Sequence, residues 1–231
     1  EESTENENLL INYIDEGEAH IKLSEFKQAA LKLTHAHELR PNEPYILQRL
    51  VLATYKSKEP SELESLMQAR TLLAQLSPAD SNDPETTGLA GAIQKRLWLL
   101  TSDPVQLDKA IEYYNRGFTL KKDYYNGENL ASCLNLKSEI QGDPNQKTFY
   151  ETAAKNTRLK LYDLLNELID SHDFGDRNDK KWIYATLANV CFHLEKNDDG
   201  NNNEALFLAE KLASWEKDSY FESKAKIPNV R

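Results

Sequence analysis

The chain has 231 residues, of which 39% are hydrophobic and 29% charged, with only 8 Gly and 8 Pro. This composition is typical of a helix-rich globular protein and excludes a disordered chain. The formal net charge of -10 disfavours binding to nucleic acids and to anionic membranes, because a negatively charged chain repels phosphate.

Cysteine usage and the apolar segments indicate a reducing compartment. Cys133 and Cys191 lie far apart, each within an apolar run, which predicts two buried thiols and no disulfide. No apolar segment approaches the ~20 residues that cross a bilayer, and the N-terminus does not resemble a signal peptide. We therefore expect a cytoplasmic protein with no membrane partner. The chain begins at Glu1 and not at Met, which predicts a piece of a longer protein.

Apolar residues at helical spacing, separated by helix-start and helix-stop signals, divide the chain into five helix pairs. Asp-Pro dipeptides beginning at Asp83, Asp103 and Asp143 mark helix starts, because Asp caps a helix and Pro fits its first turn. Capping boxes predict further starts at Thr4 and Ser61. The expected pairs span about 4–41, 44–78, 83–121, 124–171 and 179–216, and the charged tail 217–231 is expected to cap the last pair.

The first pair fits the pattern W-x2-L-G-x2-Y…A-x3-F…P of the tetratricopeptide repeat. Tyr13, Gly17 and His20 take the first-helix places, with Glu16 where Leu is usual. Ala29, Leu33 and Pro41 take the second-helix places, and the proline lies beyond the helix end. The third pair repeats the second-helix spacing at Ala110, Tyr114 and Gly117. Its first helix contains Gly88 and Gly91, and these small residues predict a close approach of the two helices.

The whole chain thus resembles a tetratricopeptide array. This resemblance implies an all-α fold, a right-handed α-solenoid of about five antiparallel helix pairs that forms a single domain, 1–231. The segment 83–134 also resembles the TRAF-binding, or central regulatory, region of apoptosis-signal-regulating kinases and of related bacterial tetratricopeptide proteins. The motifs that carry this second resemblance are DPETTGLAGAIQKR, AIEYYxRGF and DYYNGENLA. It implies a regulatory region that is attached to an effector and binds other proteins.

In tetratricopeptide arrays the first helix of each pair lines the concave face, so polar residues on those helices are the natural contacts for a ligand. The candidates here are Lys95, Arg96, Tyr125, Asn129 and Asn189. Lys95 and Arg96 could meet a carboxylate or a phosphate. Asn189 follows Ala188 in the first-helix motif, at a position that faces the groove in peptide-binding arrays. The simpler interpretation of all these residues is that they are solvated or pair with neighbouring acids.

Several other kinds of site are disfavoured. The two-carboxylate clamp for chaperone C-termini needs Lys and Asn where this chain has Ile14 and Glu18. A calcium loop that began at Glu195 would end at Leu206, which cannot coordinate an ion. No pair of histidines has a chelating spacing, and no catalytic nucleophile with a base or phosphate-binding loop is recognisable. We therefore expect no metal, no cofactor and no enzymatic activity.

Together these features predict a non-catalytic protein-interaction and regulatory scaffold. It would bind a peptide, a helix or a neighbouring domain of its own protein on the concave face, or form a homo-oligomer. The alternative is a ligand-sensing module, in which Lys95 and Arg96 bind a small anionic signal and regulate an attached effector. The sequence leaves open the partner, the effector and a bacterial or eukaryotic source.

Overall fold

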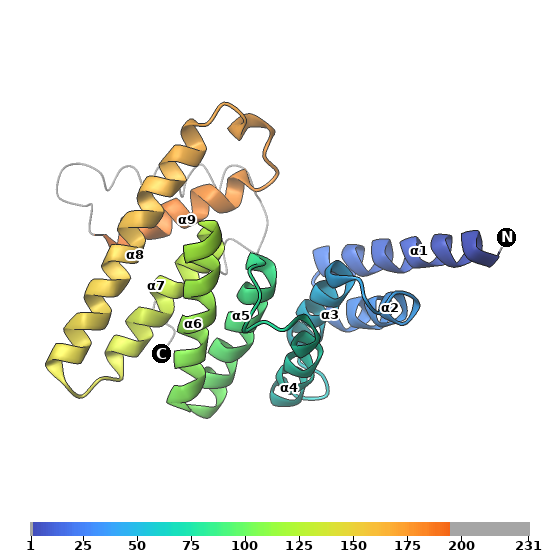
Figure 1. The fold of residues 1–231 in the computed structure, drawn as a ribbon, viewed down its shortest axis with the longest axis horizontal. Helices are drawn as coiled ribbons and strands as arrows, with labels where there is room; N and C mark the ends of the chain where they lie inside the picture. The colour runs from blue at the N-terminus through green and yellow to red at the C-terminus, as the bar shows by residue number, and fades with distance from the viewer. Residues whose placement is uncertain (1, 195–231) are drawn as a thin grey trace. The chain divides into compact units, whose positions relative to one another are not determined.

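The computed structural model describes residues 2–194, and all regular secondary structure within them is helical (Figure 1). The chain forms two compact units, Glu1–Lys121 and Lys122–Arg231. A membrane-spanning helix is absent from the described residues, because none of their helices combines the necessary length with a sufficiently apolar sequence.

Unit 1 consists of consecutive helices that pack against one another in chain order, while α3 also packs against α5. Its helices are α1 (Glu2–Lys22), α2 (Phe26–Leu39), α3 (Pro44–Ser57), α4 (Glu62–Leu73), α5 (Pro84–Thr101) and α6 (Pro104–Lys121), with the short 3-10 helix η1 (Ala74–Leu76) after α4. A buried apolar cluster lies where α3, α4 and α5 meet, and it includes Val51, Leu66 and Ile93.

Unit 2 contains α7 (Tyr124–Glu139), α8 (Pro144–Asp170) and α9 (Lys180–His193), with the 3-10 helix η2 (Phe174–Asp176) in the connection before α9. Each of the three α-helices packs against the other two. Leu161, Leu165, Ile183 and Leu187 are fully buried side chains of this unit. The predicted second helix of the fifth pair and the tail 217–231 lie outside the described residues.

The predicted helix starts are largely confirmed, because they depend on local hydrogen bonds. The side chains of Asp83 and Asp143 accept hydrogen bonds from the backbone N–H groups of the residues three and two positions later, respectively. Ser61 accepts from the backbone N–H of Glu64 and donates its hydroxyl to the Glu64 carboxylate. The predicted start at Thr4 is wrong, since α1 begins at Glu2.

The predicted close packing within pairs is confirmed for two pairs of unit 1. A β-carbon placed on Gly91 would lie 2.7 Å from the ring of Tyr114, which is fully buried on α6. A β-carbon on Gly17 would lie 2.7 Å from Cγ of Leu33, on α2. Both glycines therefore leave the space that a large side chain of the second helix fills. The all-α, tetratricopeptide-like arrangement of helix pairs is confirmed, whereas the single domain over 1–231 stays a prediction.

Candidate functional site

The first helices of the three pairs in unit 1 are α1, α3 and α5, and side-chain hydrogen bonds connect them on one side. We call this side the first-helix face. The residues that define it are Glu18 on α1, Tyr45, Gln48 and Arg49 on α3, and Asp83, Glu85 and Thr86 at the start of α5.

An ion pair joins α1 to α3. Arg49 donates from Nε to Oε1 of Glu18 at 2.5 Å and from Nη2 to Oε2 at 2.9 Å, which is a bidentate geometry. Tyr45 lies one turn before Arg49, on the same side of α3, and its hydroxyl donates to Glu18 at 3.1 Å. Burial alone would lower the pKa of Arg49, but the hydrogen bonds and charge of Glu18 raise it. The carboxylate therefore holds the guanidinium in its charged form and in one orientation.

A second contact joins α3 to α5. The side-chain amide of Gln48 donates to Oδ2 of Asp83 at 2.6 Å and to Oγ1 of Thr86 at 3.0 Å. Asp83 also caps α5, because the same oxygen accepts from the backbone N–H of Thr86 at 2.9 Å. The amide of one first helix thus binds the capped end of the next. Together the two contacts fix the spacing of the three first helices.

Lys95 and Arg96 lie on α5, and both side chains are partly buried. The guanidinium carbon of Arg96 lies 4.8 Å from the centre of the Tyr55 ring, and its Nη1 donates to the Ala92 carbonyl at 3.2 Å. Arg96 is therefore stacked on an aromatic residue of α3. The hydrogen bonds described above, which connect α1, α3 and α5 on the first-helix face, involve neither Lys95 nor Arg96.

The remaining candidates belong to unit 2. Tyr125 is 46% exposed on α7, and its carbonyl accepts from Nδ2 of Asn129 at 3.0 Å. Asn189, on α9, donates from Nδ2 to Oε1 of Glu128. The structure thus brings Tyr125 and Asn129 together, and it places Asn189 against the residue that precedes Asn129. Their role in binding stays a prediction.

A buried polar cluster in unit 2 was not anticipated from the sequence. Arg158, on α8, is only 4% exposed. With the Asn135 amide turned so that its oxygen faces the guanidinium, that oxygen accepts from both terminal nitrogens at 3.1 Å. Burial lowers the pKa of Arg158, and the charge of Glu128 offsets this only in part. Burial, together with the charge of Arg158, also lowers the pKa of His193 to about 4. The sequence contains a signal for this cluster, since Arg158 falls within the apolar stripe of α8.

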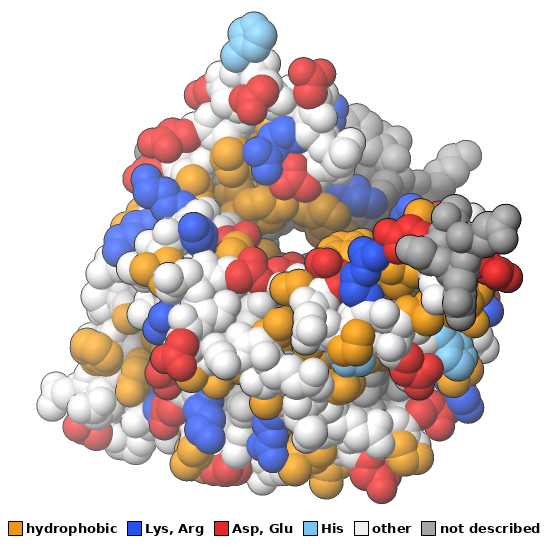
Figure 2. All heavy atoms as spheres, turned by 45° about the vertical axis from the view of Figure 1, so that its right-hand side comes forward, with side chains coloured by type: hydrophobic (Ala, Val, Ile, Leu, Met, Phe, Trp, Pro, Cys, Tyr) orange, Lys and Arg blue, Asp and Glu red, His pale blue; other side chains and the backbone are white. Residues whose placement is uncertain are grey.

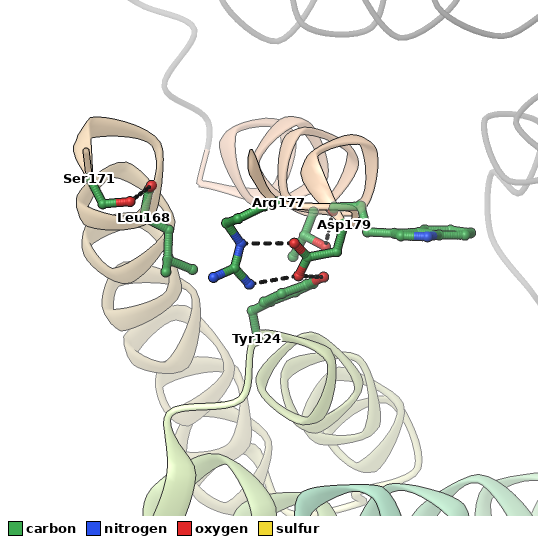
Figure 3. Close-up of polar contacts among 7 residues, drawn as sticks. Tyr124, Leu168, Ser171, Arg177 and Asp179 are labelled. Carbon is green, nitrogen blue, oxygen red and sulfur yellow. Dashed lines mark hydrogen bonds and ion pairs between the residues drawn. The ribbon is translucent and has the colours of Figure 1, made fainter. Parts of the chain in front are cut away.

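A third polar group fastens the connection before α9 to the start of α7 (Figure 3). The Tyr124 hydroxyl donates to Oδ2 of Asp179 at 3.0 Å. Arg177 donates to both carboxylate oxygens of Asp179, at 2.8 Å from Nε and 2.7 Å from Nη2. The hydrogen bond from Arg177 is the main reason that the pKa of Asp179 is lowered, while burial followed by the charge of Asp179 raises the pKa of Tyr124. No sequence pattern connects residues so far apart.

Groups of three His, Cys, Asp or Glu side chains that could hold a metal ion do not occur among residues 2–194. Both cysteines are buried and neither forms a disulfide, as predicted.

Residues 25–134 match the model of a protein family described as Tetratricopeptide Repeats-Sensor. The chain carries a tetratricopeptide-type repeat array. The matching segment is slightly less than half of the chain and extends from the residue before α2 into α7. It includes Lys95, Arg96, Tyr125 and Asn129 and ends before Asn189. A search of curated proteins found no match.

Proposed function

We propose that this array is a non-catalytic interaction and regulatory domain, which binds a peptide, a helix or a neighbouring domain of its own protein on the first-helix face. The observation that carries this proposal is the hydrogen-bonded connection of α1, α3 and α5 through Glu18, Arg49, Gln48 and Asp83. These side chains are already held in position before any partner arrives. Pre-organised contacts reduce the entropy that is lost on binding.

Tyr45 is the natural anchor for a partner on this face. Its side chain is 47% exposed, while its hydroxyl is held by Glu18. Tyrosine is common among the residues that contribute most to protein interfaces, because it offers a large apolar area with few rotatable bonds. The exposed part of the ring is therefore available for contact, and its orientation is already fixed.

Two further observations support a regulatory role. The matching family is described as a sensor, and the match covers α3 and α5. The resemblance of 83–134 to the TRAF-binding region implies, in addition, that the domain controls an effector in the same protein. Tetratricopeptide repeats are typically non-catalytic, which agrees with the predicted lack of enzymatic activity.

The proposal is tested by photo-crosslinking in the full-length parent protein. A benzoylphenylalanine at position 45, and another at position 125, should crosslink to a defined segment that mass spectrometry identifies. Leu31 on α2 provides the control position, since it is 59% exposed and lies on a second helix. The crosslinking yield at position 45 should fall when Arg49→Glu breaks the ion pair. Equal yields at positions 45 and 31 would contradict a binding role for the first-helix face.

The alternative function is a module that senses a small anionic signal. The observation that favours it is the adjacent pair Lys95 and Arg96, within the segment that matches a family described as a sensor. The stacking of Arg96 on Tyr55 still leaves it able to form charge-assisted hydrogen bonds. Calorimetric titration with nucleotides should give heat for the natural chain and none for Lys95→Glu. No heat in either case argues against this alternative.

A further inference from the structure

A shallow cavity of about 360 Å³ lies within unit 1, between the connection from α4 to α5 and the outer side of α6. The side chains that give it chemical character are Asn82, Glu112, Tyr113, Asn115, Arg116 and Leu120. Glu112, Asn115 and Arg116 lie three and four residues apart, which places them on one side of α6. The volume is within the range of sites that bind small ligands or single side chains.

Arg116 holds the connection in place above α6. Its Nε donates to the Ser81 carbonyl at 2.8 Å, and its Nη2 donates to the Asp80 carbonyl and to Oδ1 of Asn82, each at 3.2 Å. The guanidinium therefore has three acceptors in the 80–82 segment. These bonds form one wall of the cavity, and they direct the guanidinium towards the 80–82 segment.

Glu112 is the charged group that remains available. A glutamate four residues before an arginine on a helix commonly pairs with it. Here Arg116 is directed at the 80–82 segment, and no hydrogen bond or ion pair from the described residues reaches the exposed Glu112 carboxylate. The cavity thus presents a carboxylate that can accept several hydrogen bonds from a ligand.

Apolar surface lies beside this carboxylate. The Tyr113 ring is partly buried and packs against the cluster formed by α3, α4 and α5, while Leu120 is 50% exposed. Tyr113 and Glu112 both line the cavity, and burial together with the charge of Glu112 raises the pKa of Tyr113. A carboxylate beside an aromatic ring and an aliphatic side chain suits a ligand with a cationic head and an apolar stem.

We propose that this cavity receives an arginine or lysine side chain of a protein partner. The cationic head would bind Glu112, and the methylene stem would lie along Tyr113 and Leu120. The Asn82 and Asn115 amides, at the same cavity, can hydrogen-bond the backbone of the partner segment. The inference rests on the proposed interaction function, because it assumes a protein partner, but it assigns that partner a second contact outside the first-helix face.

Charge supports the choice of a basic partner. Residues 1–121 contain 19 Asp and Glu against 13 Lys and Arg, so unit 1 attracts basic segments. Figure 2 shows acidic, basic and apolar side chains intermixed over the face in view, and the described part of that face has no broad field of one sign.

The test uses the whole chain, labelled with nitrogen-15, and titrations with acetyl-Gly-Arg-Gly-amide and with the corresponding Lys, Glu and norleucine peptides. The Arg and Lys peptides should shift the amide signals of residues 79–82 and 112–120, with saturation in the millimolar range. Glu112→Gln keeps the size of the side chain and removes its charge, and it should weaken this binding about tenfold. Asp108→Asn, one turn earlier on α6, is the matched control and should leave the affinity unchanged.

Equal or stronger shifts with the Glu or norleucine peptide, unchanged affinity in Glu112→Gln, or no localised shifts would overturn the inference. Crosslinking at position 45 separates this result from the proposed function, because that position reports on the first-helix face. If crosslinking persists and the cavity does not bind the Arg peptide, only the cavity inference fails. If the cavity binds and crosslinking at position 45 shows no preference over position 31, the proposed role of the first-helix face fails.

Discussion

Arg49 in unit 1 and Arg158 in unit 2 both connect helices, but their surroundings differ. Arg49 meets Glu18 through two hydrogen bonds, and both side chains retain about a fifth of their exposure, at 21% and 22%. Arg158 is only 4% exposed, and its terminal nitrogens share one amide oxygen, that of Asn135. The pKa of Arg49 is raised and that of Arg158 is lowered.

The comparison shows that partner and burial together decide what a charged residue does for the fold. A carboxylate at bidentate distance compensates for the partial burial of Arg49. For Arg158, the charge of Glu128 offsets part of the cost of burial. The Glu128 carboxylate also accepts a hydrogen bond from Asn189. A buried cation with incomplete compensation makes its surroundings sensitive to any loss of negative charge. We therefore expect the stability of unit 2 to depend on Glu128 more strongly than the stability of unit 1 depends on Glu18.

The largest expected effect follows from removing this charge. Glu128→Gln should lower the opening free energy of α7–α9 by about 3 kcal/mol, because Arg158 is left buried without a counter-charge. Residue-resolved hydrogen exchange measures this free energy separately for each unit. Glu151→Gln is the control, since Glu151 forms a long, exposed pair with Lys147, and it should change the value by less than about 0.5 kcal/mol. Similar losses in both variants would refute the comparison.

Removing both charges should restore much of the stability. The double variant Glu128→Leu, Arg158→Met replaces the two charged side chains by apolar ones of comparable size. Its loss should be smaller than the sum of the two single losses by about 2 kcal/mol, because neither charge remains buried alone. A double-mutant cycle by hydrogen exchange measures this coupling. Additive losses would show that Glu128 and Arg158 act independently.

The equivalent change in unit 1 should be milder. Glu18→Gln should cost about 1 kcal/mol in the opening free energy of α1 and α3, because the Arg49 guanidinium, whose side chain is 21% exposed, can still reach water. The same exchange experiment measures it. If the opening free energy fell as much as it does in Glu128→Gln, the difference in exposure between Arg49 and Arg158 would have no effect on stability.

The smallest expected effect is a pH dependence near Arg158. The pKa of His193 is lowered to about 4 from an ordinary value near 6.5. Between these values the unfolded chain binds the proton more readily than the folded chain does, so α9 is fully stabilised above pH 6.5 and loses stability as the pH falls towards 4. The loss is small, because His193 still contacts water at the end of α9, although neighbouring atoms of unit 2 partly desolvate its imidazole.

Hydrogen exchange of α9 at pH 7 and pH 5 measures this dependence. His193→Gln should remove it, whereas His35→Gln in unit 1 should not change it. In Arg158→Met the dependence should weaken, because one cause of the lowered pKa is lost. An unchanged slope in His193→Gln would assign the pH dependence to another group.

Features that depend on neighbouring residues were predictable from the sequence. The caps at Ser61, Asp83 and Asp143 use hydrogen bonds within one turn, and the helix starts after them were located correctly. The glycine and large-residue positions also follow from the repeat pattern, because each helix pair brings the same positions together. The prediction failed at Thr4, because α1 begins two residues earlier, at Glu2.

Features that depend on contacts between distant residues were not predictable in the same way. Glu18 and Arg49 are 31 residues apart, and nothing in the spacing of either helix identifies the other. From the sequence, Glu18 only excludes a carboxylate clamp, whereas in the structure its carboxylate holds Arg49. Arg158 is different, since it lies four residues after Ala154 and three before Leu161, both of which are fully buried. A charged residue at such a position is a readable signal of a polar cluster in a helical core.

The match between Gly91 and Tyr114, and between Gly17 and Leu33, bears on how such repeats can be exchanged during evolution or design. The two hollows accept side chains of different shape, a ring in one pair and a branched aliphatic group in the other. A complete helix pair carries its hollow and the side chain that fills it, so it can be duplicated or transplanted as a unit. A single helix cannot be moved so freely, since α6 placed against α1 would bring a tyrosine to a space that was shaped around leucine.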